Sequence, residues 1–210
     1  MSVLEVKNVS YYYCRDRMVV DNISESFESG KMYVILGPSG CGKTTLLSLL
    51  GGLDLPKEGQ VLFEGKEIGK KELEEHRRSH ISFVFQNYNL IDYMTPVENV
   101  ELTAKQDALP VLEKLGLSKD QAKRNVMKLS GGQQQRVAIA RALASGNPVI
   151  LADEPTGNLD EDMAKEITGI FREAAEEYRR CVIIVSHSHE VAKQADVVFA
   201  MDHGKLTRTA

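Results

Sequence analysis

Residues 37–44 have the types and spacing that bind the phosphates of a nucleotide. Their sequence, Gly-Pro-Ser-Gly-Cys-Gly-Lys-Thr, fits the pattern G-x-x-x-x-G-K-[ST] and lies between an apolar strand and a predicted helix. In such a loop, backbone N–H groups and the helix N-terminus face the phosphates, while Lys43 adds a positive charge and the Thr44 hydroxyl can bind Mg²⁺. The alternative is a strand-to-helix turn that merely contains glycines, and the placement after a strand disfavours it.

Two adjacent carboxylates, Asp153 and Glu154, follow the apolar residues 148–152. We expect these residues to form a central strand that delivers both acids to its C-terminal edge, where open α/β sheets bind ligands. Neighbouring residues of a strand point to opposite sides, so the two acids can have different tasks. Asp153 is the candidate for holding Mg²⁺, and Glu154 is the candidate for polarising an attacking water. An acidic helix cap after a strand is the alternative.

A second anion site is predicted at residues 129–133, Leu-Ser-Gly-Gly-Gln. A strongly helical run follows, so Ser130 and the two glycines lie at a helix N-terminus, where amides, a hydroxyl and the helix dipole attract negative charge. A plain Ser-Gly-Gly helix cap is the alternative. Because a mononucleotide already has its phosphate loop, a second phosphate receptor is unexplained within one chain. It indicates an active site that a second chain completes.

Alternating strands and helices must position these three segments. Alternation and β-branched content predict two early strands, with an antiparallel edge, and the later alternation implies a mostly parallel sheet covered by helices. The predicted strands are residues 4–9, 18–27, 31–36, 61–63, 81–85, 149–152, 181–185 and 197–201. The predicted helices are residues 43–53, 133–145, 161–178 and 190–194. A strand-free helical block lies between Pro96 and Lys128.

Composition excludes several other classes of protein. The 26 basic and 30 acidic residues give a net charge of −4, so we expect no nucleic-acid partner. The cysteines Cys14, Cys41 and Cys181 are odd in number and far apart, which favours a reducing compartment over a secreted disulfide framework. The longest apolar runs are far too short to cross a bilayer. We therefore expect any work at a membrane to be done by docking onto another protein.

These motifs resemble the nucleotide-binding subunit of an ATP-binding cassette (ABC) transporter, and the likeness runs over nearly the whole chain. The matches are the Walker A loop (37–45), Gln86 of the Q-loop, the signature (129–133), the Walker B strand with Asp153 and Glu154, the D-loop (Asn158, Leu159, Asp160) and the switch residue His187. The resemblance implies an α/β fold with a P-loop NTPase core, a mostly parallel sheet, an N-terminal antiparallel β region and a small helical subdomain. It divides the single domain into a RecA-like and β core, 1–86 and 130–210, and a helical part, about 87–129.

The same resemblance implies a role for each motif residue. Nucleotide binding falls to Tyr13, Gly37, Ser39, Gly40, Cys41, Gly42, Lys43, Thr44 and Thr45; Mg²⁺ binding to Thr44, Gln86 and Asp153; catalysis to Glu154, His187 and Gln86. A second copy supplies Ser130, Gly131, Gly132 and Gln133, and Asp160 is the site residue of the D-loop. The residue that stacks on adenine is Tyr13 by its spacing, with Tyr11 and Tyr12 as alternatives. A lone histidine such as His187 is more often structural than catalytic, but the family resemblance favours the catalytic interpretation.

The implied protein is an ATPase that dimerises around two ATP and drives a transmembrane permease, and it is cytoplasmic at the inner face of the cell membrane. Residues 133–143 and 153–160 resemble the branch of lipoprotein-release, macrolide-export and antimicrobial-peptide-resistance ATPases, with a cell-division relative. That branch implies export or extraction of a peptide, lipoprotein or drug. The alternative is a sensor, signalling or cell-division module with little transport.

Three features of the chain bear on partners and metals outside these motifs. Between Asn99 and Leu129 the chain is shorter than is usual in the family, which trims the helical lobe. The apolar residues of segment 87–100 predict a groove for a helix of the membrane partner, the alternative being the core of the lobe itself. His76 and His80 are four residues apart on a predicted helix without a third ligand, so we expect a solvated helix face rather than a metal site.

Overall fold

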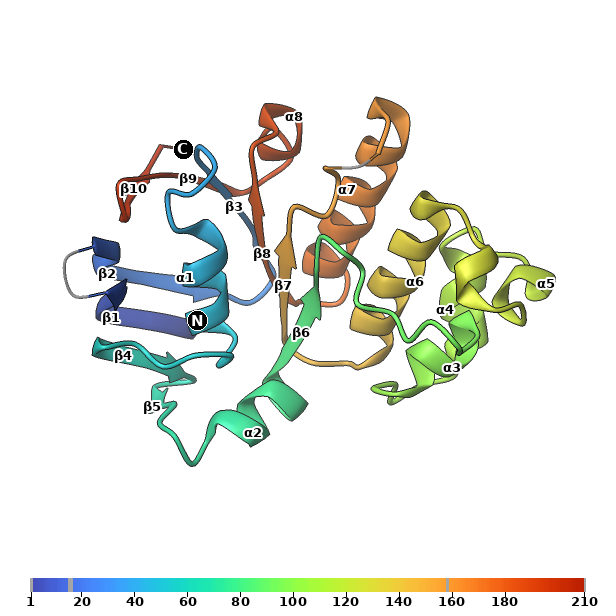
Figure 1. Ribbon diagram of the computed structural model, residues 1–210, viewed down its shortest axis with the longest axis horizontal. Helices are drawn as coiled ribbons and strands as arrows, with labels where there is room; N and C mark the ends of the chain where they lie inside the picture. The colour runs from blue at the N-terminus through green and yellow to red at the C-terminus, as the bar shows by residue number, and fades with distance from the viewer. Residues whose placement is uncertain (1, 15–16, 158, 210) are drawn as a thin grey trace.

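The computed structural model describes residues 2–14, 17–157 and 159–209. An antiparallel sheet of order β2-β1-β4-β5 holds the N-terminal region (Figure 1). Its strands are β1 (Ser2–Cys14), β2 (Arg17–Glu28), β4 (Glu58–Phe63) and β5 (Lys66–Glu67). The predicted antiparallel pairing of the two early strands is confirmed, with Val9 opposite Ile23 and Tyr11 opposite Val20. Apolar side chains of these strands alternate toward the interior, as expected for a sheet with one buried face.

A second sheet, of order β10-β9-β3-β8-β7-β6, is parallel except for its β10 edge. Its strands are β3 (Met32–Leu36), β6 (Ile81–Val84), β7 (Val149–Asp153), β8 (Cys181–Ser186), β9 (Val197–Asp202) and β10 (Lys205–Arg208). The central strands are almost uninterrupted apolar runs because helices cover both faces of this sheet. This arrangement agrees with the α/β fold expected from the sequence.

The helices differ greatly in length. They are α1 (Lys43–Leu50), α2 (Leu73–Glu75), the π-helix η1 (His76–His80), α3 (Pro96–Glu101), α4 (Ala108–Lys114), α5 (Lys119–Ala122), the 3₁₀ helix η2 (Val126–Lys128), α6 (Gly131–Ala144), α7 (Glu161–Glu176) and α8 (His189–Ala192). Within the described ranges, none of them combines the length and the apolar character that a bilayer span needs.

Helix α1 packs between the two sheets and shares one core with both (Figure 1). Its buried leucines, Leu46, Leu47, Leu49 and Leu50, contact this core from one side of the parallel sheet. A second core on the other side joins β7 and β8 to α6, α7 and the short helices of residues 96–128. The loops that carry the motifs therefore follow strands that are packed against other elements on both faces.

The structure corrects three details of the sequence prediction. Helix α1 ends at Leu50 rather than at residue 53, because Gly52 adopts a positive φ of 65°. The short edge strands β5 and β10 are largely polar and were missed. The solvated face predicted for His76 and His80 is wrong, since His76 is fully buried and its Nε2 lies 3.0 Å from the carbonyl oxygen of Leu50.

Candidate functional site

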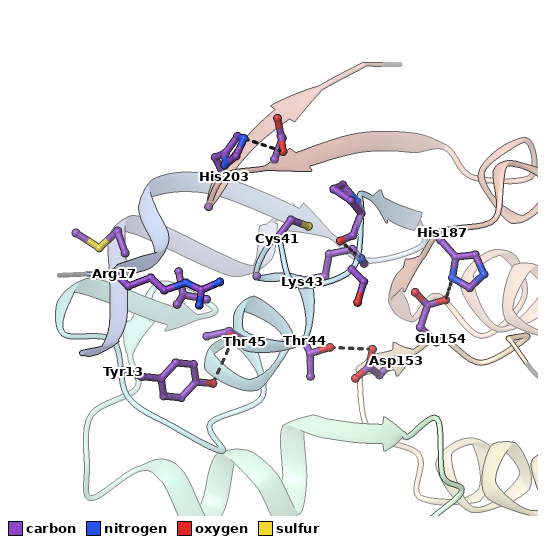
Figure 2. A pocket seen from close by; sticks show the side chains of 18 of the residues that line it. Tyr13, Arg17, Cys41, Lys43, Thr44, Thr45, Asp153, Glu154, His187 and His203 are labelled. Atoms are coloured by element: carbon purple, nitrogen blue, oxygen red, sulfur yellow. Dashed lines mark hydrogen bonds and ion pairs between the residues drawn. The ribbon is translucent and has the colours of Figure 1, made fainter. Parts of the chain in front are cut away.

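The main cavity lies at the C-terminal ends of the parallel strands and measures about 1140 Å³. It is large enough for a mononucleotide, as small-molecule pockets run from roughly 300 to 1000 Å³. Its lining combines the loop between β3 and α1 with the ends of β7 and β8 and the tip of the β1–β2 hairpin (Figure 2). From the predicted residues, the lining includes Tyr13, Ser39, Gly40, Cys41, Gly42, Lys43, Thr44, Thr45, Gln86, Asp153, Glu154 and His187.

The loop between β3 and α1 is shaped by two crowded glycines. A Cβ on Gly37 would collide with the carbonyl oxygen of Met201, and one on Gly42 would collide with that of Val19. Gly42 also has a φ of 111°, which side chains rarely adopt. Gly37 does not itself line the cavity, but its carbonyl accepts a 2.7 Å hydrogen bond from Lys43 Nζ. Only glycine fits at these two positions, and the tight turn of the loop depends on it.

Lys43 is 8% exposed, and its ammonium group folds back onto this loop. Besides Gly37 it donates to the carbonyl of Pro38 at 2.9 Å. The first turn of α1 carries no acidic side chain, and its N-terminal amides have no side-chain cap. A positive charge and a helix N-terminus therefore converge on one side of the cavity, which is the environment that a phosphate prefers.

Asp153 and Glu154 lie opposite this loop and face different partners (Figure 2). Asp153 Oδ1 lies 3.3 Å from the hydroxyl of Thr44, whereas Glu154 Oε2 lies 3.0 Å from Nδ1 of His187. Burial raises the pKa of Asp153, and the charge of Glu154 raises it further, while Thr44 and Lys43 act in the opposite direction. Asp153 is thus a carboxylate that a nearby cation would stabilise.

Glu154 has an unusual backbone and an unusual side-chain oxygen. Its φ is 45°, and its N–H donates to the carbonyl of Val185 at 3.0 Å. The His187 contact has an ion-pair distance without hydrogen-bond geometry, so the buried Oε2 has no hydrogen-bond donor in the described part of the chain. A carboxylate oxygen in this state is available to accept a hydrogen bond or a proton.

The three N-terminal tyrosines occupy different environments. Tyr13 is 71% exposed, borders the cavity, and its hydroxyl lies 3.3 Å from that of Thr45. Tyr11 is buried and hydrogen-bonds Asp54, and Tyr12 does not border the cavity in the described part of the chain. Tyr13 is therefore the tyrosine whose ring is accessible from the cavity (Figure 2).

Ser130, Gly131, Gly132 and Gln133 do not border this cavity among the residues that the structure describes. Ser130 caps α6 as predicted: its hydroxyl accepts the N–H of Gln133, and the Gln133 side chain accepts the N–H of Ser130. Asp160 likewise caps α7, accepting from Met163 N at 2.9 Å, and lies outside the cavity lining. Asn158 of the D-loop lies outside the described residues. The predicted second anion site thus lies outside the cavity that the phosphate loop lines.

The cavity also contains residues that sequence reasoning did not identify. They come from the β1–β2 hairpin and the β9–β10 turn: Cys14, Arg17, Met18, Val19, Asp202, His203 and Gly204. The N–H of Gly204 donates to the carbonyl of Cys41 at 3.3 Å, which joins the second turn to the phosphate loop. No sequence motif marks these residues, because strand order alone brings the turns to the cavity.

The segment after β6 divides between core and surface. Tyr93 is 80% exposed, whereas Leu90, Ile91 and Met94 are half-buried and Asn99 is fully buried. The Asn99 side chain accepts from Ile91 N at 2.7 Å and fixes the loop before α3. Part of the segment thus belongs to the core of the lobe, with Tyr93 as its main exposed aromatic side chain, and the groove for a partner helix stays a prediction.

Comparisons with known proteins agree with this geometry. The family model described as "ABC transporter" matches residues 20–157. The chain is 45% identical to the uncharacterized ABC transporter ATP-binding protein YclH of Bacillus subtilis, covering 99% of this chain and 96% of that protein. It is 38% identical to the lipoprotein-releasing system ATP-binding protein LolD of Rickettsia felis, with coverage of 98% and 97%.

Longer relatives and solved structures extend the likeness. The macrolide export ATP-binding/permease protein MacB of Burkholderia pseudomallei is 40% identical over 91% of this chain, which spans 31% of that protein. A dimeric structure of MJ0796, a bacterial ABC transporter cassette, superposes with a TM-score of 0.87 at 36% identity and covers 98% of both chains. A dimeric post-hydrolysis state of the same cassette, bound to ADP and Pi, has a TM-score of 0.87 at 35% identity.

Proposed function

Because the chain belongs to the ABC transporter family, as an ATP-binding subunit with ATPase activity, we propose that it works as half of a dimer that closes around two ATP molecules. One observation supports this most directly. The cavity combines the phosphate loop with Asp153 and Glu154, while the signature residues 130–133 lie elsewhere on the same chain. Each ATP would then contact the phosphate loop of one copy and the signature of the other.

In this proposal the phosphate loop holds the β- and γ-phosphates. Backbone N–H groups of the loop and of the first turn of α1 would bind the phosphates, and the Lys43 ammonium group, now held by the carbonyls of Gly37 and Pro38, lies beside them. The Tyr13 ring stacks on the adenine, since it is exposed and borders the cavity.

The side-chain oxygen atoms of Thr44, Asp153 and Gln86 are suitable ligands for Mg²⁺. The described residues contain no cluster of three or more His, Cys, Asp or Glu side chains that could hold a metal by itself. Such a cluster is not needed here, because Mg²⁺ in nucleotide sites is held by one or two carboxylates together with phosphates and water. Burial and the charge of Glu154 raise the pKa of Asp153, and a cation bound beside it would lower that pKa and stabilise the carboxylate. Mg²⁺ bound there would neutralise phosphate charge during hydrolysis.

Glu154 would act on the attacking water. Its Oε2, which has no hydrogen-bond donor in the described part of the chain, accepts a hydrogen bond from that water and orients it for in-line attack on the γ-phosphate. His187, whose Nδ1 lies 3.0 Å from this Oε2, positions the Glu154 carboxylate and contacts the γ-phosphate, and Gln86 contacts the water from the start of the loop after β6. Because the catalytic groups only position and polarise, small displacements of them have large effects on turnover.

A transmembrane permease is the second partner in this proposal. Residues 87–129 form the helical part that contacts it, with Tyr93 exposed on the segment that follows Gln86. The similarity to LolD and MacB supports export or extraction of a lipoprotein, peptide or drug, with the protein peripheral at the membrane through this partner. The remaining residues, 1–86 and 130–210, form the nucleotide-binding core.

The test is whether ATP alone creates the dimer. A Glu154→Gln variant keeps the shape of the site but cannot polarise water, so we expect Mg²⁺ and ATP to shift it from monomer to dimer in analytical ultracentrifugation. Lys43→Ala should remain monomeric under the same conditions. A Glu154→Gln protein that binds ATP and stays monomeric at high concentration contradicts the proposed dimer.

A further inference from the structure

Gln135 carries a buried amide that the functions described above do not use. The side chain is 2% exposed, and neither its Nε2 nor its Oε1 has a hydrogen-bond partner in the described part of the chain. Besides Gln135, only Glu154 contributes an unpaired buried side-chain polar atom in that part. Buried polar groups are almost always paired, and an unpaired buried amide lowers the stability of the fold.

Helix geometry directs this amide toward two loops of the nucleotide site. Side chains of an α-helix point toward its N-terminus and cover residues three and four positions earlier, which for Gln135 are Gly132 and Gly131. A Cβ on Gly131 would lie 3.2 Å from the hydroxyl of Tyr88, in the loop after β6. A Cβ on Gly132 would meet Met163, in the first turn of α7, and Leu159, at the end of the loop after β7. Helix geometry therefore directs the Gln135 side chain toward the segments that surround these two glycines.

The two loops differ in how they are attached to α6. Arg141 of α6 already holds the loop after β6, donating to the carbonyls of Tyr88 at 3.0 Å and Asn89 at 2.7 Å. The loop after β7 has turns of its own, from Gly157 N to Glu154 O and from Leu159 N to Thr156 O. In the ranges 155–157 and 159, no hydrogen bond connects it to α6.

We propose that Gln135 is a positioning residue that fastens the loop after β7 to α6 in the closed, nucleotide-bound dimer. Its amide donates to one main-chain carbonyl of this loop and accepts from one N–H, which fixes Glu154 at the start of the loop and Asp160 at its end. In the open chain the amide is unpaired, so closure alone supplies its partners. The inference rests on the proposed ATP-bound dimer and names one more residue that this dimer needs.

The test replaces the amide with an apolar group of the same length, Gln135→Met. The free chain should then be as stable as the wild type or melt a few degrees higher, because an unpaired buried amide has been removed. ATP turnover should nevertheless fall, with kcat lowered roughly tenfold to a hundredfold and KM nearly unchanged, because the loop that carries Glu154 is less well positioned. If Gln135 had only a structural role, the Gln135→Met variant would show a lower melting temperature and a lower kcat together.

Two control variants separate this effect from a general loss of a glutamine. Gln134→Met removes the neighbouring amide, whose Nε2 already donates to the carbonyl of Leu129 at 3.1 Å, so the melting temperature should fall instead. Gln60→Met removes an exposed amide of β4 whose Nε2 donates to Glu67 at 3.0 Å; because water can replace this bond, kcat should stay unchanged and the melting temperature nearly so.

Three outcomes can be distinguished when the chain is assayed together with its membrane partner. A lowered melting temperature of Gln135→Met means that the amide is already paired in the free chain, by ordered water or by the loop, and overturns the proposal. An unchanged kcat overturns it as well. Wild-type chain that fails to hydrolyse ATP with its partner contradicts the proposed function instead, before any variant is compared.

Discussion

Asp153 and Glu154 are adjacent in sequence but differ in surroundings and in the work open to them. Asp153 ends β7 with regular strand geometry and faces Thr44 of α1. Glu154 begins the next loop with a φ of 45° and faces His187 at the end of β8. The change in backbone at Glu154 turns its side chain toward the neighbouring strand, so the carboxylates proposed to hold a cation and to polarise water lie side by side.

At the residue scale, Tyr13 can be tested apart from its two neighbours. Tyr13→Ala should weaken ATP binding by about 1–3 kcal/mol, the range seen when a stacked aromatic ring is removed from a base. Equilibrium titration with a fluorescent ATP analogue measures the change. Tyr12→Ala is the matched control and should bind like the wild type, because that ring does not border the cavity. Equal losses in the two variants would contradict adenine stacking on Tyr13.

At the element scale, helix α1 is held at both ends. Its first residue follows Gly42, whose positive φ shapes the phosphate loop. At its C-terminal end, His76 Nε2 lies 3.0 Å from Leu50 O, and Arg77 donates to Gly52 O at 2.6 Å. Donors at a helix C-terminus satisfy carbonyls that would otherwise lack partners. The π-helix η1 thereby connects α1 to β6, the strand that precedes Gln86.

Folding stability should depend on pH through His76. Burial lowers the pKa of His76 below its ordinary value of 6.5, and the charges of His80 and Arg77 act in the same direction, against the hydrogen bond to Leu50. The unfolded chain therefore binds a proton more readily than the folded chain. Stability is fully present above pH 6.5 and is lost as pH falls from there through the lowered pKa. Urea unfolding between pH 7.5 and pH 5 measures this loss, at about half-unit intervals.

Two variants assign this pH dependence to His76. His76→Gln keeps a donor for Leu50 without a titrating group, so its free energy of unfolding should vary less with pH than that of the wild type. His203→Gln changes a histidine that is 94% exposed at its side chain and should keep the wild-type dependence. Parallel curves for wild type and His76→Gln would show that other groups cause the acid destabilisation.

At the scale of the whole molecule, the cavity and the helical segment lie on opposite sides of the parallel sheet. The antiparallel sheet and α1 cover one face, and α6 with the short helices of residues 96–128 covers the other (Figure 1). The loop after β6 carries Gln86 at the cavity and reaches Tyr93 beside α3. A partner that contacts Tyr93 would therefore be connected to the nucleotide site through one short segment.

We expect Tyr93 to affect the stimulation of ATPase activity by the membrane partner, and not the ATP affinity of the isolated chain. Tyr93→Ser should leave the ATP affinity of the isolated chain unchanged and reduce the partner-stimulated ATPase rate severalfold, because truncating a buried interface aromatic costs about 2 kcal/mol or more. Leu53→Ser is the control, an apolar side chain that is 47% exposed beside α1. Full stimulation of the Tyr93→Ser variant would place the partner surface elsewhere.

The sequence by itself predicted the features that depend on local spacing. The phosphate loop, the capped start of α6 and the acidic end of β7 each lie within one strand, turn or helix terminus, so residue types and intervals are sufficient to predict them. The alternating strands and helices predicted the α/β fold for the same reason. The proposed roles of individual residues, such as Glu154 and Asp160, remain predictions for the experiments above.

Only the tertiary structure decided what depends on contacts between distant segments. It joined Arg17 and His203 to the cavity, buried His76 against the end of α1, and separated the signature from the phosphate loop. It also left the buried amide of Gln135 without a hydrogen-bond partner among the described residues, although the sequence presents it as one of three similar glutamines. These features follow from the order of the strands and the packing of helices on the sheet, which bring together residues separated by up to nearly the length of the chain.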